Sequence, residues 1–420
     1  MRGGFAESVA KVAGGTVAAQ LIGVAVMPVV ARLFSPDAFG VLASYSALLM
    51  LSLTICGLRY ELAVPLIKEK RESALLFVAS IAAVCLFSAV AVVIVVAHGL
   101  GLLHASLLSQ LGSALWLVPV GILVAGTSQS VRYWAIKEQA YGMIATTTMT
   151  QGAGRAAVQI VAGVVSPNPL GLVVSEIVGQ GAGVLRIGRL AWRDTLATLH
   201  RPRLREVAQA AGRNHKYPLL LGPAALVTTG GLQAPALLLT LTYGPSVAGF
   251  YFMTQKLLGL PVQLIGKSLS QVFLGEGARL AHSDPRGLGA LFDRIAKKLF
   301  LVGLLPAAAI ALLGRWAVVH LLGPQWDIAG VFMQWLAPTF LMKLAVGDLI
   351  DLALVGRPDL SLSWASARLG LVAAAIIGAH LASLDAVQCI AALGVVTTAG
   401  YIAKWLMWRH ALRGLVVKFE

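Results

Sequence analysis

The chain has 420 residues, of which 58% are hydrophobic and only 12% are charged. A single soluble core cannot absorb that much apolar surface, so the composition excludes an ordinary globular domain and indicates a membrane protein. The formal net charge of +15 could suit nucleic acid. However, the basic residues lie in short segments between apolar stretches, where they act as topology signals.

Apolar stretches of membrane-spanning length follow one another along almost the whole chain. A transmembrane helix needs about 20 mostly apolar residues, and about twelve stretches meet that requirement. Helices are expected because the stretches lack the alternation of barrel strands. The first stretch has no small-residue cleavage site, so we interpret it as a span and not as a signal peptide. The predicted spans are 10–33, 38–65, 74–98, 112–134, 141–165, 169–191, 217–243, 247–275, 298–322, 328–355, 360–383 and 386–408.

The basic residues between the spans alternate from one connection to the next. Lys and Arg occur in or beside the connections that follow the second, fourth, sixth, eighth and tenth spans, and in the C-terminal tail. The positive-inside rule therefore predicts that both termini are cytoplasmic. Arg32, near the outer end of the first span, is the exception, and we expect it to face a wet interior. The connections without Lys or Arg are 99–111, 166–168, 244–246, 323–327 and 384–385.

Two of the basic connections, 204–211 and 288–295, place apolar residues at helical spacing. The second follows Asp284 as a candidate helix cap and Pro285 at the first helical position. We expect each segment to form either an amphipathic helix along the inner leaflet or a solvated loop helix.

The two halves of the chain share a short motif. An aromatic residue, a Pro and a Gly keep the same spacing in 34–40 and in 243–249, which stand 209 residues apart in a chain of 420. Turns favour Pro and Gly in any protein, but an offset so close to half the chain indicates a duplication. We predict two six-helix bundles, 1–205 and 206–420, related by a pseudo-two-fold axis along the membrane normal.

Charged side chains inside the predicted spans are the candidate functional residues. A charge at the bilayer centre costs about 2.5–3.5 kcal/mol on insertion scales, so it normally faces a bundle interior or a water-filled cavity. Snorkelling to the head groups or a structural ion pair is the alternative. The cations outnumber the carboxylates, which suits an anionic cargo, because Arg and Lys both bind phosphate well. The candidate substrate-binding cations are Arg32, Arg59, Arg155, Lys256, Lys267, Lys343 and Arg368.

The carboxylates inside the spans are candidates for ion coupling, because a buried carboxylate can bind a proton or a sodium ion. Asp348 and Asp351 stand one helical turn apart and share a face. Glu61 and Glu176 are further candidates. A local ion pair with a neighbouring Lys or Arg is the alternative role.

Motifs of soluble catalysis are absent from the sequence. It contains no Walker loop, no dinucleotide fingerprint after a strand, no HExxH and no GxSxG. No His stands with a carboxylate or a Cys at metal-ligand spacing. We therefore expect neither an enzyme nor an ATP-driven pump, and we expect no metal and no cofactor.

Five stretches, in chain order, resemble bacterial O-antigen and exopolysaccharide flippases of the Wzx type. These flippases belong to the multidrug/oligosaccharidyl-lipid/polysaccharide exporter (MOP) superfamily. The likeness extends along the chain, and the order of the stretches and the helix count reinforce each other. The stretches are 31–40, 58–63, 243–251, 260–266 and 322–330.

The resemblance implies an all-α membrane protein whose two six-helix bundles form a V around a central cavity. The flippase branch moves an oligosaccharide linked to undecaprenyl pyrophosphate from the cytoplasmic to the periplasmic leaflet, with coupling to a proton or sodium gradient. The resemblance thus implies a multi-pass protein of the bacterial inner (cytoplasmic) membrane that acts in lipopolysaccharide or exopolysaccharide biosynthesis. Membrane lipids, a polysaccharide polymerase and chain-length proteins are candidate partners, and nucleic acid is not.

The sequence therefore predicts a lipid-linked oligosaccharide flippase that works by alternating access. Arg and Lys would hold the pyrophosphate, and polar groups such as Tyr60 and Gln151 would meet the sugars. A proton- or sodium-coupled exporter of drugs or small molecules is the alternative within the superfamily, although its cavity should be acidic. A polymerase or ligase would need a longer periplasmic loop, and a membrane scaffold would leave the internal charges unexplained.

Overall fold

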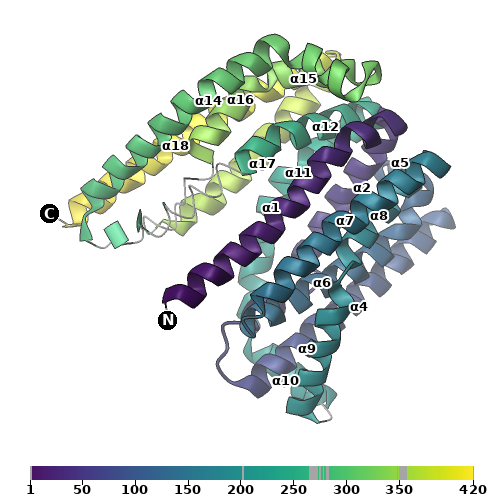
Figure 1. Cartoon of the computed structure of the whole chain (residues 1–420), viewed down its shortest axis with the longest axis vertical. Coiled ribbons are helices and arrows are strands. Elements are labelled where there is room, and N and C mark those ends of the chain that lie inside the picture. The colour runs from purple at the N-terminus through teal and green to yellow at the C-terminus, as the bar shows by residue number, and fades with distance from the viewer. Residues whose placement is uncertain are drawn as a thin grey trace. The chain divides into compact units, whose positions relative to one another are not determined.

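All regular secondary structure in the described part of the chain is helical (Figure 1). The computed structural model describes residues 2–200, 203–263, 273, 276–277, 279–280, 283–347, 349 and 357–419. The chain forms two compact units, Met1–Thr229 and Gly230–Glu420. The predicted all-α architecture is confirmed, whereas the division into six-helix bundles at residues 205 and 206 stays a prediction.

The N-terminal unit contains α1 to α10 and the start of α11. Within it, α1 packs on α7 and α7 packs on α8, while α2 and α6 both contact α8, and α4 contacts α6. The helices are α1 Arg2–Leu33, α2 Pro36–Ile55, α3 Tyr60–Ala63, α4 Lys70–Gly99, α5 Ser106–Leu111, η1 Gly112–Leu117, α6 Val118–Lys137, α7 Tyr141–Val165, α8 Pro169–Gly181, α9 Val184–Leu199, α10 Leu204–Arg213, η2 Tyr217–Leu221 and α11 Gly222–Tyr243.

Small residues allow α1 and α7 to approach closely. A Cβ atom at Gly15 would lie 2.8 Å from the Ala145 carbonyl oxygen, and one at Gly152 would lie 2.9 Å from the Ala19 Cβ. Helices inside membranes associate through such small-residue contacts, because lipid supplies no hydrophobic force between them. The pairing of α1 with α7 therefore follows from the placement of these glycines and alanines.

The C-terminal unit contains the rest of α11 and the helices that follow it. In this unit α14 packs on α15, α12 packs on α15, and α17 packs on α18. Its core includes the Phe292 ring, which stacks on Trp408 with a centroid distance of 4.0 Å. The helices are α12 Pro245–Pro261, α14 Pro285–Leu322, η4 Pro324–Trp326, α15 Asp327–Trp335, α16 Ala337–Met342, η5 Lys343–Gly347, α17 Pro358–Leu381 and α18 Ala386–Phe419.

Both copies of the shared motif begin a helix. Pro36 is the first residue of α2, and Ser35 caps that helix by accepting a hydrogen bond from the Ala38 amide at 3.3 Å. Pro245 is the first residue of α12, after Gly244 with a φ of 88°. A proline at the first helical position is favourable because its missing N–H needs no partner there. The motif thus has the same structural task in each half of the chain.

The predicted span 38–65 is not one helix, and this is a correction. α2 ends at Ile55 and α3 begins at Tyr60. Between them, Leu58 and Arg59 have positive φ angles of 51° and 60°. A right-handed helix cannot include this left-handed conformation, so the apolar run must break there.

The segment 288–295 is not a separate amphipathic helix, and this too is a correction. Asp284 caps the helix as predicted, since its Oδ1 accepts from the Gly287 amide at 2.9 Å. The helix then runs without a break through all of α14. Leu288 and Phe292 are buried in the same cluster as Trp408. The apolar face therefore packs into the core of the unit and does not lie along a leaflet.

Eight helices in the described part of the chain are long and apolar enough to cross a membrane. The number rises to ten if each of two bent pairs counts as one span, and neither α7 nor α12 is among the ten. One pair is α8 with α9, bent by 41°, and the other is Pro324–Trp335 with Ala337–Gly347, bent by 56°. A multi-span helical protein is thus confirmed, while the count of twelve and the cytoplasmic termini stay predictions.

Candidate functional site

The first polar cluster of the N-terminal unit joins α7 to α8 through an ion pair. The Arg155 guanidinium lies 2.9 Å from Glu176, whose side chain is only 14% exposed. Gln180 Nε2 donates to the same carboxylate oxygen at 3.0 Å. Gly179 leaves room for the pair, because a Cβ atom there would lie 2.7 Å from Arg155 Nε. The structure thus brings together two residues to which the sequence assigned different roles, substrate binding and ion coupling.

The cluster continues to the break between α8 and α9. The Gln180 carbonyl lies near the end of α8, where carbonyl groups lack intrahelical partners. It accepts hydrogen bonds from Ser128 Oγ at 2.7 Å and from Gln151 Nε2 at 2.9 Å. The amide oxygen of Gln151 in turn accepts from Arg132 at 3.3 Å. A row of polar groups on α6, α7 and α8 therefore connects the exposed Arg132 to Arg155.

A second cluster surrounds Glu61, which is 2% exposed. Gln129 Nε2 donates to Glu61 Oε1 at 3.0 Å, while Oε2 is buried and has no hydrogen-bond partner in the described part of the chain. Arg59 Nε is likewise buried without a partner there. A Cβ atom at Gly57 would lie 2.5 Å from Glu61 Oε2, so glycine is needed beside the carboxylate. A buried acceptor without a partner is destabilising, and a bound proton or small cation would satisfy it.

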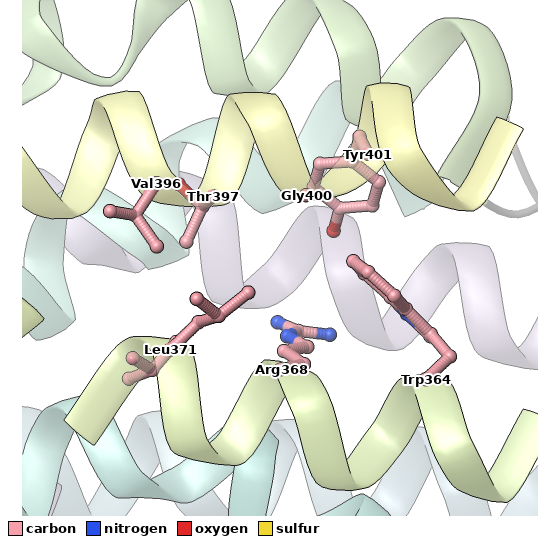
Figure 2. Close-up of a pocket in the computed structure, with 8 residues that line it drawn as sticks. Trp364, Arg368, Leu371, Val396, Thr397, Gly400 and Tyr401 are labelled. Atoms are coloured by element: carbon pink, nitrogen blue, oxygen red, sulfur yellow. The ribbon is translucent and has the colours of Figure 1, made fainter. Parts of the chain in front are cut away.

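The C-terminal unit has a pocket between α17 and α18 (Figure 2). Arg368 points from α17 into this pocket, beside Trp364 of the same helix and opposite Thr397 and Tyr401 of α18. Gly400 allows the helices to meet there, since a Cβ atom on it would lie 3.0 Å from the Trp364 ring. The lining therefore combines one cation with two aromatic rings, two hydroxyl groups and several aliphatic side chains.

Arg368 is half-buried near the middle of α17. It makes no ion pair with any residue that the structure describes. Tyr251 of α12 lies within electrostatic range of it, and the Tyr251 hydroxyl accepts a hydrogen bond from Gln255 Nε2 at 2.9 Å. A guanidinium in the middle of an apolar span is destabilising unless water or an anion contacts it. The pocket has room for about one water molecule, so it can receive water or a single anionic oxygen atom.

The other predicted cations are dispersed within the two units. Lys256 is half-buried, with its Nζ 6.0 Å from the centroid of the Phe252 ring. Lys343 is half-buried at the start of η5, and Arg32 is exposed at the end of α1. Three predicted residues lie outside the described part of the chain: Lys267, Asp348 and Asp351.

Sequence reasoning missed the uncharged members of these clusters. Gln129 and Gln180 each hydrogen-bond a carboxylate, and Ser128 bonds the carbonyl at the end of α8. Lys404 was also missed, although its Nζ donates to the Gly347 carbonyl of η5 at 3.3 Å. The available signal is the presence of amide and hydroxyl side chains within apolar spans, where they too require partners.

Comparison with known protein families gives one match that extends over most of the chain. A family model described as "Polysaccharide biosynthesis protein" matches residues 29–329. The matched segment contains four of the five stretches on which the sequence resemblance rests. A search of curated proteins finds no match.

Solved structures of similar fold are membrane transporters. An inward-facing multidrug resistance MATE family transporter of the MOP superfamily is 12% identical, with a TM-score of 0.69 over 94% of this chain and 95% of its own. An outward-facing transporter of the same description is 10% identical, with a TM-score of 0.54 over 97% and 96%. A MOP superfamily transporter from Pyrococcus furiosus, described as having a binding pocket of reverse polarity, is 11% identical, with a TM-score of 0.52 over 97% and 93%. At these identities the likeness establishes the fold.

Proposed function

This chain belongs to the polysaccharide biosynthesis protein family and has the fold of MOP superfamily transporters, and from that premise we propose that it is a flippase. Its substrate is an oligosaccharide linked to undecaprenyl pyrophosphate. It moves this lipid across the bacterial inner membrane by alternating access between the two leaflets. It is a transporter and not an enzyme, and polysaccharide polymerase and chain-length proteins are its candidate partners.

The observation that carries this proposal is the pocket of Arg368. Its guanidinium has no carboxylate partner in the described part of the chain, so its charge is available to a phosphate, which Arg binds through paired hydrogen bonds. Trp364 and Tyr401 offer flat apolar faces beside the cation. A cation beside aromatic faces suits a charged head group that is attached to sugar rings.

The remaining candidates take secondary places in the proposal. Arg32, Arg59, Lys256, Lys267 and Lys343 are further substrate-binding cations, whereas the charge of Arg155 is already met by Glu176. Among the candidates for proton or Na⁺ coupling, Glu61 has the most direct support, because one of its oxygens is buried without a partner in the described part of the chain. The other coupling candidates are Asp348, Asp351 and Glu176.

The proposed topology has twelve spans with both termini in the cytoplasm. Ten spans follow from length and composition when each bent pair counts once. We add two helices that are not among these ten. They are α7, which has 25 residues, and α12, which has 17 residues. Two six-helix bundles then result, in agreement with the helix-starting motif that the halves share.

An ion-coupled exporter of drugs or small molecules is the second candidate function. The observation in its favour is the fold likeness to multidrug resistance transporters. The uncompensated guanidinium of Arg368 argues against it, because a cationic drug would be repelled by that charge. The two functions differ in their cargo, so variants of Arg368 distinguish them.

The test is the replacement of Arg368 in a cell that depends on this chain for its surface polysaccharide. We expect Arg368→Ala to lower the amount of surface polymer at least about tenfold, because a charged hydrogen bond contributes roughly 1.5–3 kcal/mol. Lipid-linked oligosaccharide should accumulate on the cytoplasmic side. Arg368→Lys should retain part of the activity, since it keeps the charge and loses the fork geometry.

The matched control is Arg294→Ala, which removes an exposed cation from the start of α14. We expect normal polymer from this variant at the same membrane abundance. Normal polymer from Arg368→Ala would contradict the proposal. Drug resistance that rises with expression of the chain and is unaffected by Arg368→Ala would favour the exporter instead.

A further inference from the structure

The face of α9 that points away from the N-terminal unit combines basic and apolar side chains. Its opposite face is buried at every fourth residue and fixes the orientation of the helix, which packs on α4 and α6. The buried residues are Ile187, Ala191, Thr195 and Leu199. Because α9 packs on α4 and α6 with this buried face, its other face is exposed on the surface of this unit.

Three arginines form one stripe on the exposed face. Arg186, Arg189 and Arg193 stand at i, i+3 and i+7, a spacing that puts them on the same side of a helix. All three are exposed, and none has an ion pair or a side-chain hydrogen bond with a residue that the structure describes. Asp194, the only carboxylate in α9, lies within electrostatic range of Lys137 of α6. The stripe thus presents three positive charges that form no ion pair with a carboxylate in the described part of the chain.

Large apolar side chains flank the arginine stripe. Leu185, Trp192 and Leu196 are 75%, 47% and 40% exposed, and their spacing of i, i+7 and i+11 aligns them beside the arginines. The exposure of such a row of large apolar side chains to water alone is unfavourable. Apolar and cationic side chains in parallel rows are typical of helices at a membrane interface, where Trp is also enriched.

The length of α8 and α9 places this face at the inner head groups in the proposed topology. The two helices have 13 and 16 residues, about 43 Å in total, against a hydrocarbon thickness of about 30 Å. α8 begins directly after the short connection 166–168, at the outer surface. With the 41° bend taken into account, Arg186 and Arg193 lie about 24 Å and 32 Å from the start of α8 along its axis, near the depth where the hydrocarbon gives way to phosphates.

The segment after α9 continues the same composition. Arg203 and Arg205 are exposed, and Leu204 between them is 84% exposed. Clusters of four to eight basic residues on the cytoplasmic side of a membrane helix attract anionic lipids. With the stripe on α9, five described arginines belong to this cluster.

We propose that this surface of α9 binds an anionic phospholipid of the cytoplasmic leaflet. Arg186, Arg189 and Arg193 hold the phosphodiester, and Trp192 and the leucines contact the upper part of the acyl chains. We call this surface the α9 lipid face, and we define it by Arg186, Arg189, Arg193, Leu185, Trp192 and Leu196. The inference rests on the topology of the proposed function and is independent of its substrate and its coupling ion.

The test measures lipid binding to the purified full chain without any transport substrate. Phosphatidylglycerol is titrated into protein in a neutral detergent, and native mass spectrometry counts the lipids retained, with phosphatidylcholine as the reference lipid. We expect the triple variant R186Q/R189Q/R193Q to bind phosphatidylglycerol at least about tenfold more weakly, with phosphatidylcholine binding unchanged. The charge-preserving variant R186K/R189K/R193K should stay within about twofold of the natural chain.

The control variant R294Q/K297Q/K298Q removes three exposed cations from the start of α14 and should bind phosphatidylglycerol normally. Equal losses in this control, or an unchanged affinity in the α9 variant, would overturn the proposal. Displacement of phosphatidylglycerol from α9 by equimolar undecaprenyl pyrophosphate would also overturn it, because the face would then serve the transport substrate. If the triple glutamine variant is not monodisperse, Arg189→Gln alone should still show a loss of about threefold.

Discussion

Two arginines in the middle of apolar helices have opposite surroundings. Arg155 is paired with Glu176 at 2.9 Å, whereas Arg368 faces Trp364 and Tyr401 without a carboxylate in the described part of the chain. The sequence presents both simply as cations inside apolar runs. The difference arises because α7 packs on α8, a tertiary contact that the spacing of residues within one helix does not reveal. Arg155 already has a carboxylate partner, so Arg368 is the better candidate for the substrate.

The ion pair between Arg155 and Glu176 should be measurable as an energetic coupling. We expect Arg155→Gln and Glu176→Gln each to lower the thermal stability of the purified protein, because each leaves a partly buried charge without its partner. The double variant should recover about 1 kcal/mol relative to the sum of the two. The exposed pair of Arg315 and Asp327 is the control, with an expected coupling near zero. Additive effects at the pair of Arg155 and Glu176 would mean that it contributes no coupling energy to stability.

Gly400 should control the Arg368 pocket without touching its charge. A side chain at this position would meet the Trp364 ring, so Gly400→Val should displace the ring and close the pocket. We expect surface polysaccharide to fall as it does in Arg368→Ala, while membrane abundance is maintained. Gly378→Val is the matched control, because a Cβ atom at Gly378 has nothing within 4 Å. Equal amounts of surface polysaccharide from the two valine variants would show that transport does not require the pocket.

At the scale of elements, α10 is attached to the N-terminal unit by charged contacts. Glu206 pairs with Arg71 at 3.2 Å, and Arg213 pairs with Glu72 at 3.3 Å. The Tyr60 hydroxyl adds a hydrogen bond to a carbonyl oxygen of α10 at 3.3 Å. The helix therefore docks on the start of α4, at the end of the unit from which the chain continues to α11. Tyr60, which the sequence assigned to the sugars, has a partner in this contact.

The docking of α10 should depend on charge and on salt. We expect the reversal Glu72→Lys with Glu206→Lys to expose the connection 200–216 to proteolysis several-fold faster, because both ion pairs become repulsive. Reversal of Arg71 and Arg213 to Glu in the same chain should restore the original rate. Salt of about 0.5 M should accelerate cleavage of the natural chain, since exposed pairs are screened. Cleavage rates that ignore both changes would show that α10 is held by its apolar contacts.

Some features of the helices can be predicted from the sequence, and others cannot. Asp284 was predicted to cap a helix, and it does so, because a cap depends on neighbouring residues alone. The end of α2 was not predicted, because Leu58 and Arg59 are compatible with a helix by composition and leave it only through their positive φ angles. For the first turns of α14 the sequence left two alternatives, a helix along the inner leaflet and a solvated loop helix, since periodicity marks an apolar face without identifying what covers it. In the structure that face packs near Trp408.

At the scale of the whole molecule, the multi-span helical fold and the family were predictable from the sequence. The length of an apolar stretch is a local property that the bilayer selects directly, so it is read without any knowledge of packing. The family match over residues 29–329 confirms the resemblance carried by the stretches that begin at Ala31. The polar clusters were less predictable, because their members come from different helices. Gln129 of α6 meets Glu61 of α3 only in the folded unit. Gln180 and Glu176 lie four residues apart on α8, so their hydrogen bond follows from helical spacing.

The central claim is that the cation of Arg368 receives a phosphate-bearing lipid, and transport in vesicles tests it most directly. The purified chain is reconstituted with a fluorescent oligosaccharide linked to undecaprenyl pyrophosphate, and the fraction of label that a membrane-impermeant reductant can reach is followed over time. We predict rapid exchange between leaflets with the natural chain and with Arg294→Ala, and at least about tenfold slower exchange with Arg368→Ala. Exchange by Arg368→Ala at the rate of the natural chain would contradict the account.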